Sequence, residues 1–260
     1  MVAGLSLALV AVLGVEVYLA ATAPYLPGDP GLEVQATVGP TSAATPVELV
    51  VLGDSTVMGI GSPTLEQSLP VLVAERVASR LSRPVHVVAM GASGARTATV
   101  LERQVPLLEG SEPDAVLVVV GSNDVTHVTA PWTMRRQSTA LVEAVRKAGH
   151  APVVIGGIPQ FRTVPALLQP LRWVTGRYAS VLRGVQRQAT TQAGAAYVDI
   201  AALASPRFIG RPESMSSDGY HPSPVGYGFW ADALAPTVAD AVSGARAACC
   251  SSGSGLYPWT

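Results

Sequence analysis

Hydrophobic runs along the chain alternate with segments in which apolar residues recur at helical spacing. Mostly apolar runs of strand length lie at residues 47–52, 85–90, 115–120, 153–155 and 195–200. Helical spacing of apolar residues predicts helices at residues 65–81, 97–108, 133–148 and 224–242. Apolar strands that are separated by helices are typical of a parallel sheet covered on both faces. We therefore expect an α/β fold, a three-layer α/β/α sandwich with a central, mainly parallel five-stranded sheet.

Composition divides the chain into four segments. Residues 1–23 are almost wholly apolar, a length near the roughly 20 residues that a membrane-spanning helix needs. Residues 24–46 are rich in Pro, Gly, Thr and Ser, and their prolines disfavour regular structure, so we expect a linker. The folded domain then covers residues 47–244. Residues 245–260, which are rich in Ser and Gly and contain both cysteines, are expected to be a disordered tail.

Three interpretations of residues 1–23 remain open: a retained membrane anchor, a cleaved signal peptide and a buried core helix. The small residues Ala21, Thr22 and Ala23 resemble a signal cleavage site. Against cleavage, no Lys or Arg precedes the apolar run, and Pro24 would follow the cut. Both targeting interpretations predict an extracytoplasmic protein, secreted or membrane-anchored, with membrane association through this segment.

The charge of the chain excludes some classes of protein. Only 13% of the residues are charged and 48% are hydrophobic, which is unlike a disordered chain. The net charge is −1 and no basic run is present, so a nucleic-acid partner is not expected. No cluster of His, Cys, Asp or Glu has the spacing of a metal site, and no motif indicates a cofactor.

Polar residues follow the first predicted strand, where parallel sheets place their active sites. Gly53-Asp54-Ser55 ends that strand, and a serine at a strand-to-helix turn can act as a nucleophile. The competing interpretation of Ser55 is an ordinary helix N-cap. Val57 stands where the G-x-S-x-G elbow of other hydrolases has its second glycine, so that motif is absent.

Possible donors to an oxyanion follow the next two strands. Gly91 and Gly94 allow unusual backbone angles, so a backbone N–H there can point into a site, although a plain turn explains them equally well. Asn123 follows the third strand and can donate its side-chain amide, although Asn is also a common loop residue.

A candidate base precedes the last predicted helix. His221 can take the proton of a serine, and a carboxylate is needed to orient such a base. Asp218 lies three residues before it, close enough within one loop to reach the far ring nitrogen. A surface Asp and a surface His would explain the pair if it stood alone. Asp199 ends another strand but has no histidine nearby in the sequence.

Taken together, these segments resemble the SGNH (GDSL-type) hydrolases. The resemblance rests on Gly53-Asp54-Ser55, Gly94, Gly121-x-Asn123-Asp124 and Asp218-x-x-His221, in that order. It implies a flavodoxin-like fold with Ser55 as nucleophile, His221 as base and Asp218 as the residue that orients it. It also implies an oxyanion hole formed by the Ser55 amide, the Gly94 amide and the Asn123 side chain. Two departures are Thr56, where leucine is usual, and Gly91 as a rival to Gly94.

Residues 160–176 follow the fourth strand and contain several large apolar side chains. If they overhang the catalytic edge, Phe161, Leu168 and Trp173 form an apolar wall or lid for an acyl chain. Asp54, beside the nucleophile, is a further candidate for substrate binding. Ordinary helix packing is the alternative for the apolar stripe.

Three functional classes are compatible with these motifs. The first is a serine esterase acting on short- or medium-chain acyl esters, lipids or acylated sugars. The second is an acyltransferase that uses the same residues to pass an acyl group to a sugar or glycolipid. The third is a non-catalytic, membrane-tethered binding domain, which the complete Ser, Asn, Asp and His set disfavours. The expected partner is a small-molecule or lipid ester.

Overall fold

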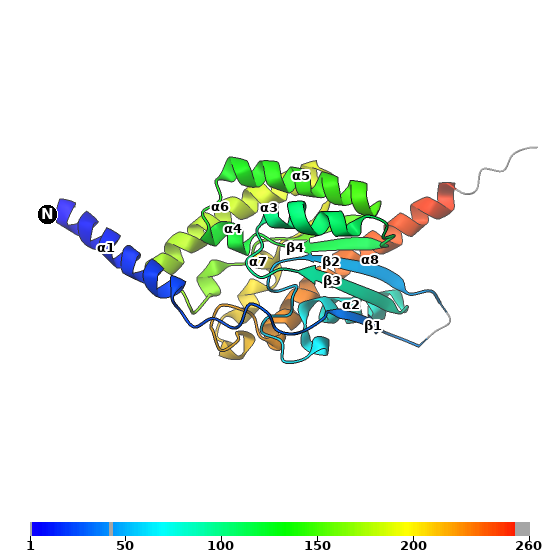
Figure 1. Ribbon diagram of the computed structural model, residues 1–260, viewed down its shortest axis with the longest axis horizontal. Helices are drawn as coiled ribbons and strands as arrows, with labels where there is room; N and C mark the ends of the chain where they lie inside the picture. Colours follow the sequence, from blue (N-terminus) through cyan, green and yellow to red (C-terminus); the bar gives the residue numbers. More distant parts are fainter. Residues whose placement is uncertain (1, 42–43, 253–260) are drawn as a thin grey trace, which may run out of the picture.

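A mostly parallel sheet forms the centre of the computed structural model, which describes residues 2–41 and 44–252. Its five parallel strands have the spatial order β3-β2-β4-β5-β6. Their bounds are β2 (Val47–Gly53), β3 (Val85–Gly91), β4 (Ala115–Val119), β5 (Val153–Gly156) and β6 (Ala196–Val198). The α/β class with helices on both faces is confirmed (Figure 1). The order in which the chain adds strands reverses at β2, since β3 lies on one side of β2 and β4 on the other. Ligand sites of such sheets lie at the carboxyl ends of the strands beside this point, so the active edge is expected at the end of β2.

A sixth strand, β1 (Gln35–Val38), corrects two predictions. It pairs antiparallel with β3 at the edge of the sheet, so the sheet has six strands within the described residues rather than five. Residues 24–46 are therefore not wholly irregular. The strand is only four residues long and partly exposed, and an edge strand needs little hydrophobic sequence, so its pattern is weak.

The side chains of β2 explain the three layers. Leu49 and Val51 enter a core shared with α2 (Leu69–Leu81) and α8 (Pro224–Ser252). Val50 and Leu52 enter the opposite core, which includes residues of α5 (Pro131–Gly149). Since successive strand residues point to opposite faces, a strand apolar at every position is buried on both sides.

Two predicted helices are interrupted, and each interruption involves a proline. Residues 97–108 form α3 (Thr97–Thr99), a π-helical turn η2 (Val100–Gln104) and a 3-10 turn η3 (Val105–Leu108). Pro106 lacks the N–H that an α-helix needs at that position. Likewise, η1 (Leu65–Gln67) precedes α2, which begins next to Pro70.

Helix α6 (Leu171–Gln192) is not among the helices that the apolar pattern predicts. It packs along α5 on one face of the sheet (Figure 1). The shorter elements are α4 (Ser122–Thr126), η4 (Phe161–Thr163), α7 (Ile200–Leu203), η5 (Ser205–Phe208) and η6 (Pro212–Ser214). Residues 245–252, expected to be disordered, continue helix α8, in keeping with the helix propensity of their alanines. Residues 253–260 lie outside the described residues.

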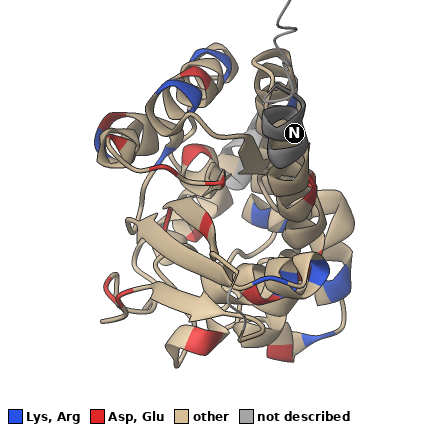
Figure 2. Cartoon of the chain, turned by 90° about the vertical axis from the view of Figure 1, so that its right-hand side faces the viewer, with Lys and Arg blue, Asp and Glu red and all other residues tan. Residues whose placement is uncertain are grey.

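The first helix, α1 (Val2–Ala21), projects from the body of the molecule and meets it at the start of α6 (Figure 1). There the buried Glu16 side chain accepts a hydrogen bond from the Leu171 N–H at 2.7 Å. No helix within the described residues is both long and apolar enough to cross a bilayer. Figure 2 shows acidic and basic residues distributed over several elements of the domain.

Candidate active site

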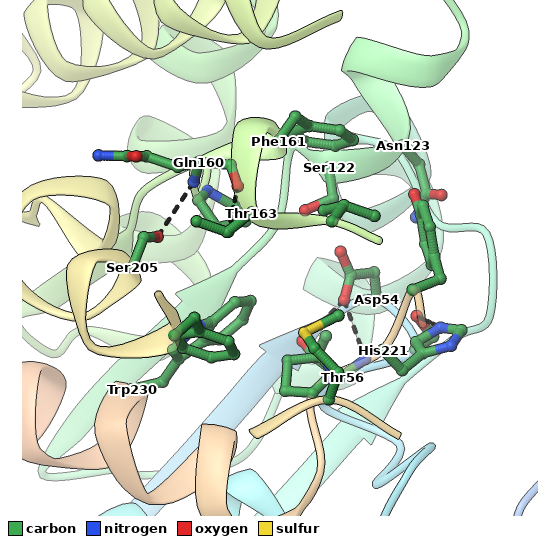
Figure 3. A pocket seen from close by; sticks show the side chains of 17 residues that line it. Asp54, Thr56, Ser122, Asn123, Gln160, Phe161, Thr163, Ser205, His221 and Trp230 are labelled. Carbon is green, nitrogen blue, oxygen red and sulfur yellow. Dashed lines mark hydrogen bonds between the residues drawn. The ribbon is translucent and has the colours of Figure 1, made fainter. Parts of the chain in front are cut away.

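The serine, glycine, asparagine and histidine predicted from the sequence meet at one edge of the sheet. Ser55 follows β2, Gly94 follows β3, and Asn123 lies in α4 after β4. His221 comes from the loop before α8 and enters the same edge (Figure 3). The carboxyl ends of parallel strands share one edge, which explains why residues so distant in sequence come together.

The turn that carries Ser55 is fixed by a close backbone approach. A Cβ at Gly53 would lie 2.1 Å from the Val119 carbonyl oxygen, so only glycine fits. The Gln104 side chain donates to the Gly53 carbonyl and accepts from the Gly53 N–H, both at 2.8 Å. Both backbone polar groups of Gly53, the residue where the nucleophile turn begins, are thus hydrogen-bonded to one side chain.

Asp54 and Thr56 bracket Ser55 and are linked to each other. Asp54 Oδ1 accepts hydrogen bonds from the Thr56 N–H at 3.0 Å and from its hydroxyl at 2.8 Å. Burial raises the pKa of Asp54, and the two hydrogen bonds from Thr56 oppose that shift only in part. The hydroxyl bond gives Thr56, where leucine is usual in the family that the sequence resembles, a structural role.

Ser55 and His221 are both buried and lie within hydrogen-bond distance. Ser55 Oγ is 3.1 Å from His221 Nε2, and His221 Nδ1 is 2.6 Å from Asp218 Oδ2. Asp218 Oδ1 also accepts from the backbone N–H groups of Tyr220 and His221, at 2.9 and 3.0 Å. This is the geometry in which a serine can pass its proton to an oriented imidazole.

The Asp218 carboxylate is held in its ionised form. Burial disfavours the charge, but the hydrogen bonds from the His221 ring and from the two backbone N–H groups outweigh it and lower the pKa of Asp218 to about 2. Asp199, the competing carboxylate, instead caps α7 by accepting from the Ala202 N–H at 3.0 Å. The geometry therefore pairs His221 with Asp218.

Three N–H groups at this edge are available to a bound oxyanion. Among the described residues, the backbone N–H groups of Ser55 and Gly94 have no hydrogen-bond acceptor. Asn123 Nδ2 donates one hydrogen to the Ala95 carbonyl at 3.0 Å and carries a second hydrogen. The bond to Ala95 fixes the orientation of the Asn123 amide group, and with it the direction in which the second N–H points.

Gly91, the last residue of β3, and Gly94, three residues later, have different roles. A Cβ on Gly91 would lie 2.5 Å from the Met58 backbone nitrogen and 2.9 Å from the Asp54 carbonyl oxygen, so Gly91 permits the nucleophile turn to pack on β3. Gly94 has a φ of +73° and open space around it, so it supplies a left-handed turn.

Asp124 fastens the two donor loops together. It is fully buried, and its Oδ2 accepts from both the N–H and the hydroxyl of Thr97 at 2.8 Å. Its Oδ1 accepts from the Thr129 hydroxyl at 3.0 Å. The loop with Gly94 is therefore tied to the helix with Asn123.

A pocket with a mainly apolar wall adjoins Ser55 and His221. Of the four residues that the sequence suggests for substrate binding, Asp54 and Phe161 line it, whereas Leu168 and Trp173 do not and are about half exposed. In Figure 3, His221 and Asn123 stand at one side of the pocket, and Ser205 and Trp230 at the other. Gln160 and Val164, within the predicted wall of residues 160–176, line the pocket too, and lining residues that the sequence did not suggest include Ser122, Phe208, Met215 and Trp230.

No group of three or more His, Cys, Asp or Glu side chains within the described ranges is arranged to hold a metal ion. The chemistry available at this site is that of the serine, the imidazole, the carboxylate and the three N–H donors.

The three-layer fold and the Ser55–His221–Asp218 arrangement are those of an SGNH-type hydrolase. Residues 51–229 match the model of the GDSL-like lipase/acylhydrolase family, and the chain belongs to that family. The resemblance noted from the sequence motifs is thereby confirmed.

Two relatives and one solved structure illustrate the similarity. A GDSL-like esterase of Mycobacterium tuberculosis is 31% identical over 199 residues, which is 76% of this chain and 63% of that relative. An arylesterase of Vibrio mimicus is 26% identical over 68% of this chain and 80% of its own length. An alpha/beta hydrolase from the metagenome of Lake Arreo has the same fold, with a TM-score of 0.59 and 20% identity over 74% of this chain and 94% of that one.

Proposed function

We propose that the chain hydrolyses carboxylic esters through an acyl-enzyme on Ser55. The main support is a series of two contacts. Ser55 Oγ lies 3.1 Å from His221 Nε2, and His221 Nδ1 lies 2.6 Å from Asp218 Oδ2. Membership of the GDSL-like lipase/acylhydrolase family supports the same reaction class.

In the first half of the reaction, His221 Nε2 takes the hydroxyl proton as Ser55 Oγ attacks the ester carbonyl carbon. The ionised Asp218 stabilises the imidazolium that forms. The C–O bond to the alcohol then breaks, and His221 returns its proton to the leaving alcohol. In the second half, His221 takes a proton from water, the resulting nucleophile attacks the acyl-enzyme, and Ser55 leaves with its proton restored.

Negative charge on the carbonyl oxygen is stabilised by preorganised donors. The backbone N–H groups of Ser55 and Gly94 and the second amide hydrogen of Asn123 fill this role. Because these donors are held by the turn after β2, by the Thr97–Asp124 bonds and by the Ala95 carbonyl, they need little reorganisation during the reaction.

The acyl group occupies the pocket beside Ser55. The space beside Ser55, open mouth included, is about 570 Å³. Apolar walls from Phe161, Val164, Phe208 and Met215 fit a short or medium aliphatic chain. The alcohol part, in a simple ester, a lipid or an acylated sugar, leaves toward solvent.

The test is a panel of p-nitrophenyl esters of increasing acyl length, assayed with the wild-type chain and with Ser55→Ala. We expect turnover that is highest for short or medium chains and absent in Ser55→Ala. Labelling by a fluorophosphonate probe should likewise require Ser55. Turnover or labelling that persists in Ser55→Ala would overturn the assignment of the nucleophile.

Repeating the panel with added alcohol acceptors distinguishes hydrolysis from acyl transfer. For a hydrolase, the free acid remains the main product at every acceptor concentration. A predominant new ester would instead identify an acyltransferase. Absence of turnover and of labelling in the wild-type chain would leave a binding domain as the correct class.

A further inference from the structure

A segment outside the family-matched region contacts the residues that orient His221. We call residues 24–34 the N-terminal strap; in Figure 1 it is the dark blue chain that runs from the end of α1 to β1. The Leu26 N–H, near its start, donates to Asp218 Oδ2 at 3.3 Å. This is the same oxygen that faces His221 Nδ1.

The strap contact differs in origin from the other contacts of Asp218. Oδ1 accepts from the N–H groups of Tyr220 and His221, and Oδ2 accepts from the His221 ring, so all three donors lie within the same short loop. Leu26 is 192 residues away in the chain. It therefore links the loop to an independent part of the molecule.

An aromatic contact runs parallel to that hydrogen bond. The ring of Tyr25 meets the ring of Tyr220 edge to face, with centroids 5.2 Å apart. Tyr220 in turn meets the imidazole of His221 edge to face, also at 5.2 Å. The strap thus supports the loop beside the imidazole as well as at the carboxylate.

The far end of the strap is anchored in the sheet. Val34 is buried in the core, and its carbonyl accepts from the Ala89 N–H of β3 at 2.9 Å. Leu32 packs against the same core. Because β1 follows directly and pairs with β3, the position of Leu26 is tied to the strand beside β2.

From these contacts we propose that Tyr25 and Leu26 are positioning residues for the His221–Asp218 pair. The inference rests on the proposed esterase function. The terminal torsion of an Asp side chain is soft, so its two oxygens are not fixed by rotamer preference alone. The Leu26 N–H holds Oδ2 toward His221, and the Tyr25 ring limits movement of the loop.

The most direct test removes a single hydrogen-bond donor, the Leu26 N–H, from the whole chain. Leucic acid incorporated at position 26 replaces the backbone amide by an ester and keeps the side chain. The matched control is leucic acid at position 32, because the Leu32 N–H has no acceptor among the described residues. A net hydrogen bond contributes about 0.5–1.5 kcal/mol, so we expect kcat to fall about 2- to 12-fold at position 26 only.

Two readouts separate positioning from general damage. KM should stay unchanged, because neither Tyr25 nor Leu26 lines the pocket. The NMR resonance of the proton between His221 Nδ1 and Asp218 should shift in the position-26 ester and stay in place in the position-32 ester. A kcat, KM and resonance equal to those of the wild-type chain, or equal losses in both esters, would overturn the proposal.

A second pair of variants tests the aromatic contact. Tyr25→Phe keeps the ring and should keep wild-type kcat, whereas Tyr25→Ala should lower kcat with KM unchanged. Equal kcat for the two variants would contradict the role given to the ring. Fluorophosphonate labelling should need Ser55 in every variant, so loss of that requirement would signal failure of the proposed function rather than of the strap.

Discussion

The buried Gln104 side chain forms a pair of 2.8 Å hydrogen bonds with the backbone of Gly53, two residues before the nucleophile. One bond is donated to the Gly53 carbonyl, and the other is accepted from its N–H. Gln104 reaches this position from the π-helical turn η2, whose geometry differs from that of the α-helix that the sequence predicts.

We expect Gln104→Glu to damage both stability and catalysis. A carboxylate oxygen cannot donate to the Gly53 carbonyl, so that carbonyl keeps only the Ala92 N–H at 3.1 Å and faces the carboxylate as a second acceptor. Loss of a buried hydrogen bond costs about 1–3 kcal/mol, which urea denaturation can measure. A fall in kcat should accompany it, because the turn that carries Ser55 loses its support.

The matched control for Gln104 is Gln188→Glu, at an exposed position where the side-chain oxygen accepts a hydrogen bond from Arg135 Nη2 at 2.7 Å. This variant should keep the stability and kcat of the wild-type chain. Equal stabilities of Gln104→Glu and the wild-type chain would show that the paired contact does not support the nucleophile turn.

A second prediction concerns Asn123. Asn123→Ala removes one oxyanion donor and should lower kcat by about 10²–10³, with a much smaller effect on KM. The Ala95 carbonyl also loses its donor, so a thermal melt is needed to show that the variant is folded at the assay temperature. A folded Asn123→Ala variant with wild-type kcat would remove this residue from the oxyanion hole.

The strands and the residues at their ends could be predicted because each carries a local signal. Strands β2 and β4 are apolar on both faces; β2 ends in Gly53, and Gly121 and Asn123 come shortly after β4, where the backbone must turn. The pairing of His221 with Asp218 was likewise predictable, since three residues separate them. Residues that are close in the sequence stay close in the fold, so a contact such as this one can be predicted from their spacing.

Features that depend on distant contacts could not be predicted in the same way. Strand β1 is recognisable only through its partner β3, and the strap only through Asp218, which lies 192 residues beyond Leu26. The prolines of residues 24–46 therefore predict a linker for both segments. The location predicted from residues 1–23 stays a prediction.

The third prediction follows from the pKa of Asp218. Its folded value of about 2 lies below the ordinary value of 3.8, so its ionised form stabilises the fold above about pH 4, and this contribution is lost as the pH falls toward 2. The difference amounts to about 2 kcal/mol. Asp218→Asn should therefore be less stable than the wild-type chain at pH 7, and the gap should narrow toward pH 2.

Urea denaturation at a series of pH values between 2 and 7 measures that gap. Asp240→Asn, at an exposed position of α8, serves as the control and should follow the wild-type curve. A stability gap between Asp218→Asn and the wild-type chain that stays constant over the whole range would contradict the low pKa of this carboxyl.

The last prediction compares a residue that lines the pocket with an exposed residue that lies outside it. Phe161 is 2% exposed and lines the pocket, whereas Trp173 is 55% exposed and lies outside it. Phe161→Leu should enlarge the space beside Ser55 and shift the preference of the ester panel toward longer acyl chains. Trp173→Ala should leave that preference unchanged, because its ring does not contact the acyl site. The measurement is kcat/KM across the panel for both variants, and a shift caused by Trp173→Ala alone would restore residues 160–176 as a lid.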